Sequence, residues 1–578
     1  MKLHRFAGEA GFAKRAAFVL AIAAVVAFAI WYSFIASSAG SSANVATLLP
    51  AETSLLVHIP NVNRARSEWE QCDLYQLYCE PAVQAFLGKP AAQLLANDGF
   101  AASTLGDLEA LDATDIFVAS VSGERTRFVG GLRFGCNRPQ AEAIVARWKA
   151  KLTERSFAAK QTGADYEGHQ LEILEVGGLN VTTTFSAKQF FFASNVEDLK
   201  ALLDRVDGRL KTTSLAQAQE YRAALAHMPA AGHALLVFAR PNSWREQVPF
   251  GVGATALCYA TRFDGGRMRD VAFIAMLEQK IDPISRFAAS LGTPNTFLYS
   301  TALLNPASAS AGTPARFGQL SRVTDAIAAA GVTADECNAA FGPELSLLAD
   351  WNENARWPGA FLVAEVKDSA RANDVATRVG NSFAPGGWSV TTQDGVQYHT
   401  LSTLTGFMVF NPTIGVSDKV LVVGFDAAGV EAAIKRAGAG GGLVQLRSYQ
   451  AASNLVAAPK NMFVYLDLSL LYQRLDSSLR PLIQMAGALM PGVSDWIDAS
   501  KLPAPDIVAK HLGPLVVSEH YDRDGYVVES CGPVTWIGAT IPAMYDGNSG
   551  LPMGSPSFLS PFGLRRGGIP GGTPSPTP

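Results

Sequence analysis

Two stretches decide how this chain of 578 residues folds: YATRFDGGRMRDVAFI at Tyr259–Ile274 and SEHYDRDGYVVESCG at Ser518–Gly532. In both, residues of high strand propensity flank a short turn that contains Asp and Gly. This arrangement is typical of a β-hairpin. The two hairpins are similar in pattern and lie about 260 residues apart, so they indicate that one structural unit occurs twice.

Other segments recur in the same order and at similar offsets. Tyr166–Leu174 matches Gln393–Leu401, Ala187–Val206 matches Ser417–Ala437, Glu220–Phe238 matches Ser448–Leu466, and Gly131–Trp148 matches Phe361–Val379. Identities are few, so the duplication rests on matched order and pattern. We therefore expect two tandem repeats, residues 48–280 and 290–534. The second carries a helical insertion at 477–511 that has no counterpart in the first.

Helical segments alternate with strand pairs in both repeats, and several of the strand connections are short hairpins. Hairpins join antiparallel strands, whereas parallel strands need long crossovers. The pattern predicts an α+β fold, in which each repeat forms a mixed or antiparallel sheet with helices packed on it.

A stretch without charged residues, Ala16–Ala36, precedes the repeats and is long enough to cross a bilayer as a helix. Lys and Arg residues gather before it, and no Lys or Arg follows until Arg64. The positive-inside rule then predicts a cytoplasmic segment at 1–15, a transmembrane anchor at 16–36 and a linker at 37–47. The expected location is the inner membrane, single-pass, with the bulk of the chain extracytoplasmic. A cleaved signal peptide is the alternative.

The net charge is −4 and the sequence pI is about 6.1. A nucleic-acid-binding protein needs a basic face that displaces counterions from phosphates, so this class of partner is not expected. Residues 541–578 are rich in Gly, Pro and Ser and poor in large apolar residues. This composition predicts a disordered tail.

The opening of the first repeat, LLPAETSLLVHIPNVNRARSEWEQ followed by LYCEPAVQAFLGK, covers Leu48–Leu87 closely. It resembles a family of bacterial exported, often membrane-anchored proteins, defined by the domain of unknown function numbered thirty-three fifty-two. The acid-Pro-x-Val-x-x-Phe segment that its members carry is matched here at Glu80–Phe86. The second repeat keeps the Pro, Thr and strand in GTPNTFLYS but lacks the acid-Pro segment. The resemblance implies an envelope location and brings no established activity and no functional residues.

The sequence contains no short catalytic, nucleotide-binding or metal-binding motif in the structural context that such a motif requires. The eight histidines, His4, His58, His169, His227, His233, His399, His511 and His520, form no zinc-protease motif. Gly251–Ala256 follows Pro249 and runs into an apolar stretch, so a loop explains it better than a dinucleotide fingerprint. Asp522–Gly525 lacks the later ligands of a calcium loop, and a hairpin turn is the better interpretation. We therefore nominate no catalytic, cofactor-binding or metal-binding residue and expect no cofactor.

Export would place the six cysteines in an oxidising compartment, where pairing is expected. Cys72 and Cys79 are close in sequence, and we predict a disulfide between them. On one unbroken helix they would lie about 10 Å apart, beyond the roughly 7 Å that a disulfide allows between Cα atoms. The bond therefore requires the helix to break near Asp73. The alternative is two free thiols, and Cys136, Cys258, Cys337 and Cys531 stay unassigned.

Two functional hypotheses follow. The first is a non-catalytic envelope module, anchored in the membrane by its N-terminal helix, that binds a protein, a lipid or a wall component through its sheet or clefts. The second is an extracytoplasmic hydrolase whose site assembles from dispersed residues, which leave no short motif.

Overall fold

The computed structural model describes residues 45–535, except for 98–106, 108–109, 123–126, 155–158, 177–178, 230–231, 241–253, 278–282, 304–326, 402, 406–407, 438, 440 and 490–497. The predicted segments 1–15 and 16–36 and the tail 541–578 lie outside the described residues. Of the linker 37–47, only Val45–Thr47 is described, where it begins a short helix.

The first half of the described chain contains ten strands. Its elements are α2 (Val45–Leu48), β1 (Thr53–Ile59), α3 (Val62–Trp69), α4 (Asp73–Cys79), α5 (Pro81–Asn97), β2 (Ala113–Val121), β3 (Arg127–Phe134), α7 (Arg138–Glu154), β4 (Ala159–Tyr166), β5 (His169–Val176), β6 (Leu179–Ser186), β7 (Gln189–Ala193), α8 (Val196–Val206), η1 (Leu215–Gln217), α9 (Gln219–Leu225), β8 (Leu235–Ala239), β9 (Ala256–Asp264) and β10 (Arg267–Ala275).

The second half repeats much of this order. Its elements are η3 (Phe287–Leu291), β11 (Thr296–Leu303), α12 (Ala334–Ala340), β12 (Phe341–Asp350), β13 (Gly359–Val366), α13 (Ser369–Phe383), β14 (Trp388–Gln393), β15 (Val396–Leu401), β16 (Thr403–Thr405), β17 (Met408–Phe410), β18 (Thr413–Val416), β19 (Val420–Gly424), α14 (Ala427–Arg436), η4 (Leu443–Gln445), α15 (Arg447–Ser453), β20 (Met462–Asp467), α16 (Leu468–Leu489), η5 (Ala499–Lys501), α18 (Pro505–Ala509), β21 (Pro514–Asp522) and β22 (Gly525–Gly532). The predicted insertion 477–511 corresponds to most of α16 with η5 and α18.

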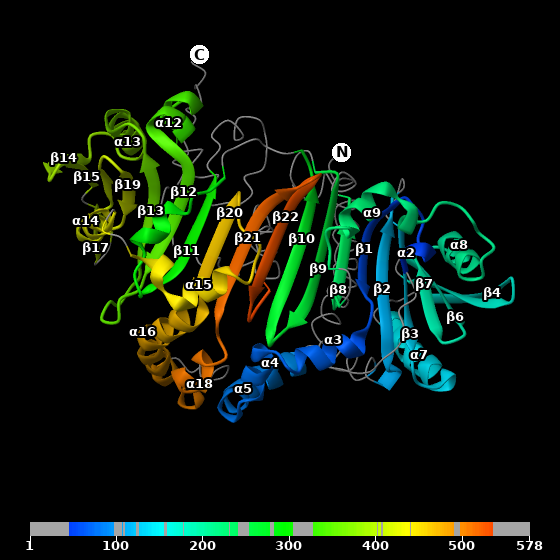
Figure 1. Ribbon diagram of the computed structural model, residues 1–578. Coiled ribbons are helices and arrows are strands. Elements are labelled where there is room, and N and C mark those ends of the chain that lie inside the picture. The colour runs from blue at the N-terminus through cyan, green and yellow to red at the C-terminus, as the bar shows by residue number, and fades with distance from the viewer. Residues whose placement is uncertain are drawn as a thin grey trace, which may run out of the picture.

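All strands except β16 and β17, which pair with each other, belong to one 20-stranded antiparallel sheet. The pairings give the spatial order β4-β5-β6-β7-β3-β2-β1-β8-β9-β10 and then β22-β21-β20-β11-β12-β13-β19-β18-β15-β14. Read from either end, the two halves follow the same connectivity, and they meet where β10 lies beside β22 (Figure 1).

The predicted fold class, two tandem sheets behind a transmembrane helix, is therefore wrong. The last strand of each half would be an open edge if the halves were separate, and unpaired edges are unfavourable. Instead β10 and β22 pair over eight register positions and join the halves into one sheet. Gly525 permits this contact, because a Cβ at that position would lie 2.4 Å from the carbonyl oxygen of Ile274.

No helix in the described part of the chain has the length and apolar character needed to cross a membrane. The prediction of a single-pass membrane protein with a signal anchor is therefore not supported by the described residues, and its predicted span, 16–36, lies outside them.

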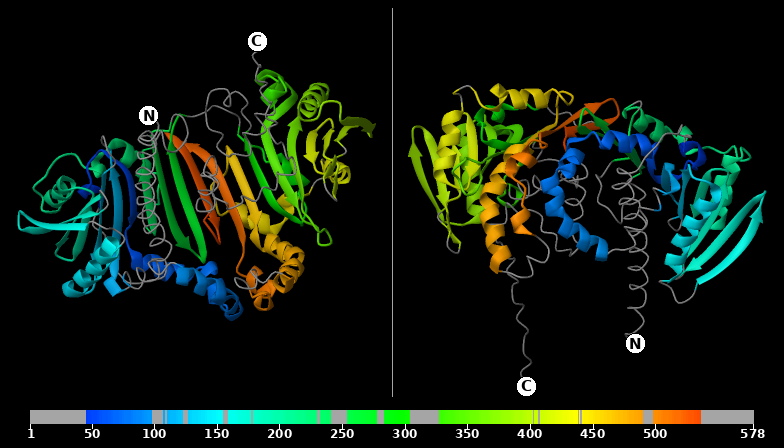
Figure 2. Two further views of the ribbon diagram at one scale, coloured as in Figure 1. Left: turned by 180° about the vertical axis from the view of Figure 1, so that it is seen from behind. Right: turned by 90° about the horizontal axis from the view of Figure 1, so that it is seen from below.

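The sheet bends into an arch, with α3–α5 and α16 on its inner side and α9 and α15 on its outer side (Figure 2). The outer face of each half carries a hydrophobic core. In the first half, Leu56, Phe117 and Phe238 of the sheet pack against α2, α8 and α9. In the second half, Tyr299, Phe463 and Val363 pack against η3, α14 and α15. Burial of such alternating apolar faces against helices is what stabilises a sheet of this width.

Candidate functional site

Each half buries a polar pair at the same position of its sheet. In the first half, His58 Nε2 lies 2.8 Å from Asp115 Oδ1, and both residues are buried. In the second half, Thr301 donates to Glu344 at 2.7 Å. Glu344 also accepts bonds from the backbone N–H groups of Ser285 and Arg286. Because these pairs are buried and fully engaged, their role is to fix neighbouring elements.

A third buried acid lies at the junction of the two halves. Asp270 of β10 is 1% exposed and accepts hydrogen bonds from Tyr259 of β9 and from Ser530 of β22, at 3.0 and 2.9 Å. Burial raises the pKa of Tyr259 well above its usual value, and the carboxyl of Asp270 adds to this effect. The three side chains therefore connect the halves across the sheet.

The structure places both cysteines of the predicted disulfide at the ends of α4. Cys72 is its buried N-cap residue and Cys79 its exposed last residue, and both thiols are free. The interruption between helices α3 and α4 comes before Cys72, not between Cys72 and Cys79. The two cysteines are therefore seven positions apart along one helix, and the helical rise separates their Cα atoms by about 10 Å. Burial, with help from Asp73 and Glu68, raises the pKa of the Cys72 thiol to about 12. The disulfide stays a prediction, and it would require α4 to open.

Among the described residues, no group of three His, Cys, Asp or Glu side chains is arranged to hold a metal ion. The two ends of the sheet, where backbone groups of the edge strands face outward, are the other candidate places for a site.

The edge strands β4 and β14 occupy equivalent ends of the sheet but differ in sequence. Strand β4 reads AKQTGADY and carries Lys160 and Asp165, whereas β14 reads WSVTTQ and carries no charge. Charged residues on an edge oppose pairing with further strands, and β-branched residues favour it. In the described part of the chain, β14 pairs with β15 alone. Its residue Val390 is 51% exposed.

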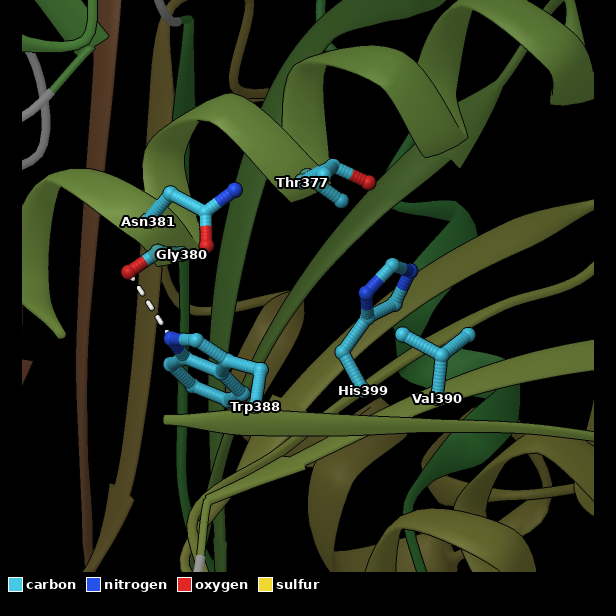
Figure 3. A pocket seen from close by; sticks show the side chains of 7 residues that line it. Thr377, Gly380, Asn381, Trp388, Val390 and His399 are labelled. Carbon is cyan, nitrogen blue, oxygen red and sulfur yellow. Dashed lines mark hydrogen bonds between the residues drawn. The ribbon is translucent and has the colours of Figure 1, made fainter. Parts of the chain in front are cut away.

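A pocket adjoins this edge. It is lined by Ala376, Thr377, Gly380 and Asn381 of α13, Trp388 and Val390 of β14, and His399 of β15, and its volume is about 200 Å³ (Figure 3). Trp388 forms one wall, held by a hydrogen bond of 2.8 Å from its Nε1 to the carbonyl oxygen of Gly380. His399 is 3% exposed, and its Nε2 is buried without a hydrogen-bond partner in the described part of the chain.

Burial lowers the pKa of His399, so its imidazole is neutral at pH 7. None of the residues that line the pocket carries a charge at that pH. The pocket therefore offers an aromatic wall and neutral hydrogen-bonding groups, which suits recognition of an uncharged group.

No motif in the sequence pointed directly to this site. His399 belongs to no metal-binding motif in the sequence, and its burial depends on how α13 crosses β15. A signal was present in the matched segments, which align His399 with Glu172. An exposed acid in one repeat and a buried histidine in the other indicate a local difference between the repeats.

Comparison with known proteins does not assign the chain to a family. No known family profile matches it, and no curated protein is similar to it. The resemblance to the domain numbered thirty-three fifty-two thus stays a prediction. Two solved structures are similar, crystal forms III and I of TP0453, at 8% and 7% identity. They cover 42% of this chain and 84% and 82% of their own, with TM-scores of 0.26 and 0.23. Scores this low support no conclusion about fold or function.

Proposed function

We propose that this chain is a non-catalytic binding module that takes an extended polypeptide segment of a partner protein as an additional strand on β14. The observation that carries the proposal is an uncharged, exposed edge strand at one end of the sheet and a charged one at the equivalent other end. Strand addition is a common way for a sheet edge to recognise a peptide.

The register indicates which groups of β14 are available. The two-residue turn Asp394–Gly395, with φ of 52° and 77°, makes Gln393 and Val396 a hydrogen-bonded pair. Hydrogen-bonded pairs alternate along an antiparallel hairpin. The backbone groups of Trp388, Val390 and Thr392 therefore point away from β15, toward the open edge.

A bound strand would gain affinity from these backbone groups and specificity from side chains beside β14. Trp388 and Val390 face the pocket, and Val390 lies directly opposite His399. Every second side chain of an added strand would lie on this same face of the sheet.

The test uses the full chain to select binders from a phage-displayed library of random peptides. Val390→Pro removes one outward N–H but leaves the bonds from Ser389, Thr391 and Gln393 to β15 in place. We expect selected peptides to bind this variant at least tenfold more weakly and to protect Trp388–Gln393 from hydrogen exchange in the original chain.

The matched control is Gln161→Pro on β4, where the same alternation places Gln161 on the outward side of the opposite edge. This variant should bind the peptides normally. The proposal is wrong if the peptides bind the Val390→Pro variant as well as the original chain, or if their protection maps elsewhere.

A further inference from the structure

The pocket beside β14 can be compared with the equivalent place in the first half, and the two places differ at two positions. Helices α7 and α13 can be aligned at their N-cap residues, Asn137 and Asp368. Lys149 then corresponds to Gly380. The hairpins β4–β5 and β14–β15 superpose through their turns, so Glu172 corresponds to His399.

In the first half, the side chains of Lys149 and Glu172 form an ion pair between helix and sheet. In the second half, Gly380 stands in place of Lys149 and has no side chain. His399 stands in place of Glu172, so no ion pair links helix and sheet at these two positions. The cavity of about 200 Å³ lies at the place in the second half that corresponds to this ion pair.

A larger residue in place of Gly380 would change the shape of the cavity. A Cβ at this position would lie 3.3 Å from Cε2 and 3.4 Å from Nε1 of Trp388, so the Trp388 wall would have to shift. The glycine thus allows the indole ring to pack against α13 and leave its inner face to the cavity.

The size and polarity of the cavity limit its ligand. An engineered apolar cavity of about 150 Å³ binds benzene, so this one accommodates a single six-membered ring. Thr377 already donates its hydroxyl to Asn373 at 2.7 Å and can still accept. Together with Asn381 and a neutral His399, it favours a group that both donates and accepts a hydrogen bond.

We propose that this cavity binds an uncharged six-membered aromatic ring with one hydroxyl group, packed on Trp388 and hydrogen-bonded to His399. A phenol meets these requirements, either as a free molecule or as the side chain of a tyrosine. A hydroxyl suits either tautomer of the imidazole, and a ring that carries a charge would lose its hydration without a partner. The site does not depend on strand addition at β14, although a tyrosine of an added strand could reach it.

The test measures binding of p-cresol, toluene and benzoate to the full chain by calorimetry and ligand-observed NMR. We expect p-cresol to bind with a dissociation constant of about 1 mM or below. Toluene should bind roughly tenfold more weakly, because a hydrogen bond is lost, and benzoate should not bind.

The decisive variant rebuilds the ion pair of the first half. Gly380→Lys combined with His399→Glu fills the cavity with the pair found at Lys149 and Glu172, and p-cresol binding should fall by more than tenfold. If this variant is misfolded by circular dichroism, His399→Leu serves instead and should abolish the preference for p-cresol over toluene.

The reverse exchange, Lys149→Gly with Glu172→His, is the matched control and should leave p-cresol binding at the second half unchanged. Equal binding of p-cresol and toluene, or unchanged p-cresol binding in the filled variant, overturns the proposal. Free p-cresol needs no strand pairing. Thr392→Pro removes another outward N–H of β14 but lies outside the pocket lining, so it should weaken peptide binding and leave p-cresol binding unchanged, which separates the two experiments.

Discussion

At the residue scale, Glu344 connects two elements that are distant in sequence. Its carboxylate accepts from Thr301 of β11 and from the backbone of Ser285 and Arg286, which precede η3. Arg286 has a φ of 58°, a conformation that costs energy for a residue other than glycine. The bond to Glu344 helps to hold the chain in that conformation.

We expect Glu344→Ala to destabilise the protein by about 3 kcal/mol, because the buried hydroxyl of Thr301 and the backbone N–H groups of Ser285 and Arg286 lose their acceptor. Glu344→Gln keeps one carbonyl oxygen and should cost less. Urea denaturation measures both, with Glu353→Ala as the control, since that side chain is 82% exposed. A loss below about 1 kcal/mol for the alanine variant would contradict this role for the carboxylate.

His233 predicts a dependence of stability on pH. Burial, together with His58 and Arg64, lowers its pKa to about 4 from an ordinary value of 6.5. Between these two values the unfolded chain binds a proton at this site and the folded chain does not. Stability should therefore fall as the pH is lowered from 6.5 to 4, by on the order of 2 kcal/mol from this residue.

The measurement is the free energy of unfolding at pH 7, 6, 5 and 4 for the original chain and for His233→Gln. The variant should show a smaller loss on acidification. An identical pH profile in the two proteins would mean that other groups cause the loss.

At the element scale, His227 fastens the end of α9 to the β21–β22 turn of the other half. Its Nδ1 lies 3.2 Å from Asp522, and its Nε2 lies 2.8 Å from Asp524. The ring stacks on Phe273 with centroids 3.9 Å apart and planes 8° apart. This contact fixes a turn that would otherwise project from the middle of the sheet.

We expect His227→Ala to weaken this contact by about 1 kcal/mol, which corresponds to roughly fivefold faster hydrogen exchange in the β21–β22 turn. His227→Phe keeps the stacking and removes the bonds to the two acids, so it separates the contributions. If exchange in the turn stays the same in the alanine variant, the turn is held by its strands alone.

The elements themselves could be predicted from sequence to a useful extent. The hairpins predicted at Tyr259–Ile274 and Ser518–Gly532 are present in the structure as β9–β10 and β21–β22. The sequence predicts a helix break near Asp73. In the structure the break between α3 and α4 lies just before Cys72, which is the N-cap residue of α4. Helix breaks depend on tertiary contacts as much as on propensity. Here the backbone N–H of Asp73 bonds to the carbonyl of Gly266, a contact that local sequence does not contain.

At the scale of the whole molecule, one sheet should unfold as one unit. Val271 is paired on both sides, with Ala260 of β9 and Glu529 of β22. Val271→Pro therefore removes a ladder hydrogen bond at the centre of the sheet and should cost at least about 3 kcal/mol. We expect a single calorimetric transition that moves to lower temperature.

Gln161→Pro is the control at this scale, because its N–H faces the open edge of β4. It should shift the transition by less than about 1 kcal/mol in stability. Two separate transitions, of which only one responds to Val271→Pro, would show that the halves are independent.

What the sequence could not provide is the pairing that joins the halves. The alternation of apolar residues in β10 is the same whether that strand is an edge or lies inside a sheet. The matched hairpins indicated a repeated unit, but pattern alone cannot tell which strand of one unit meets which strand of the other. The pocket could not be predicted for a similar reason, since its lining residues, such as Gly380 of α13 and His399 of β15, come together only when the helix packs on the sheet.

The register of β10 against β22 has an evolutionary meaning. The turns Asp264–Arg267 and Asp522–Gly525 correspond, so Val271 corresponds to Glu529, and these two residues face each other directly. Ile274 likewise faces Tyr526, and Met268 faces Gly532, the exchanged counterparts. This is the pairing of a symmetric homodimer, in which one surface binds an identical copy of itself across a two-fold axis. An ancestor with a single ten-stranded unit would have covered its last edge in this way, and fusion of two such genes would have made a permanent partner of what was once a second chain.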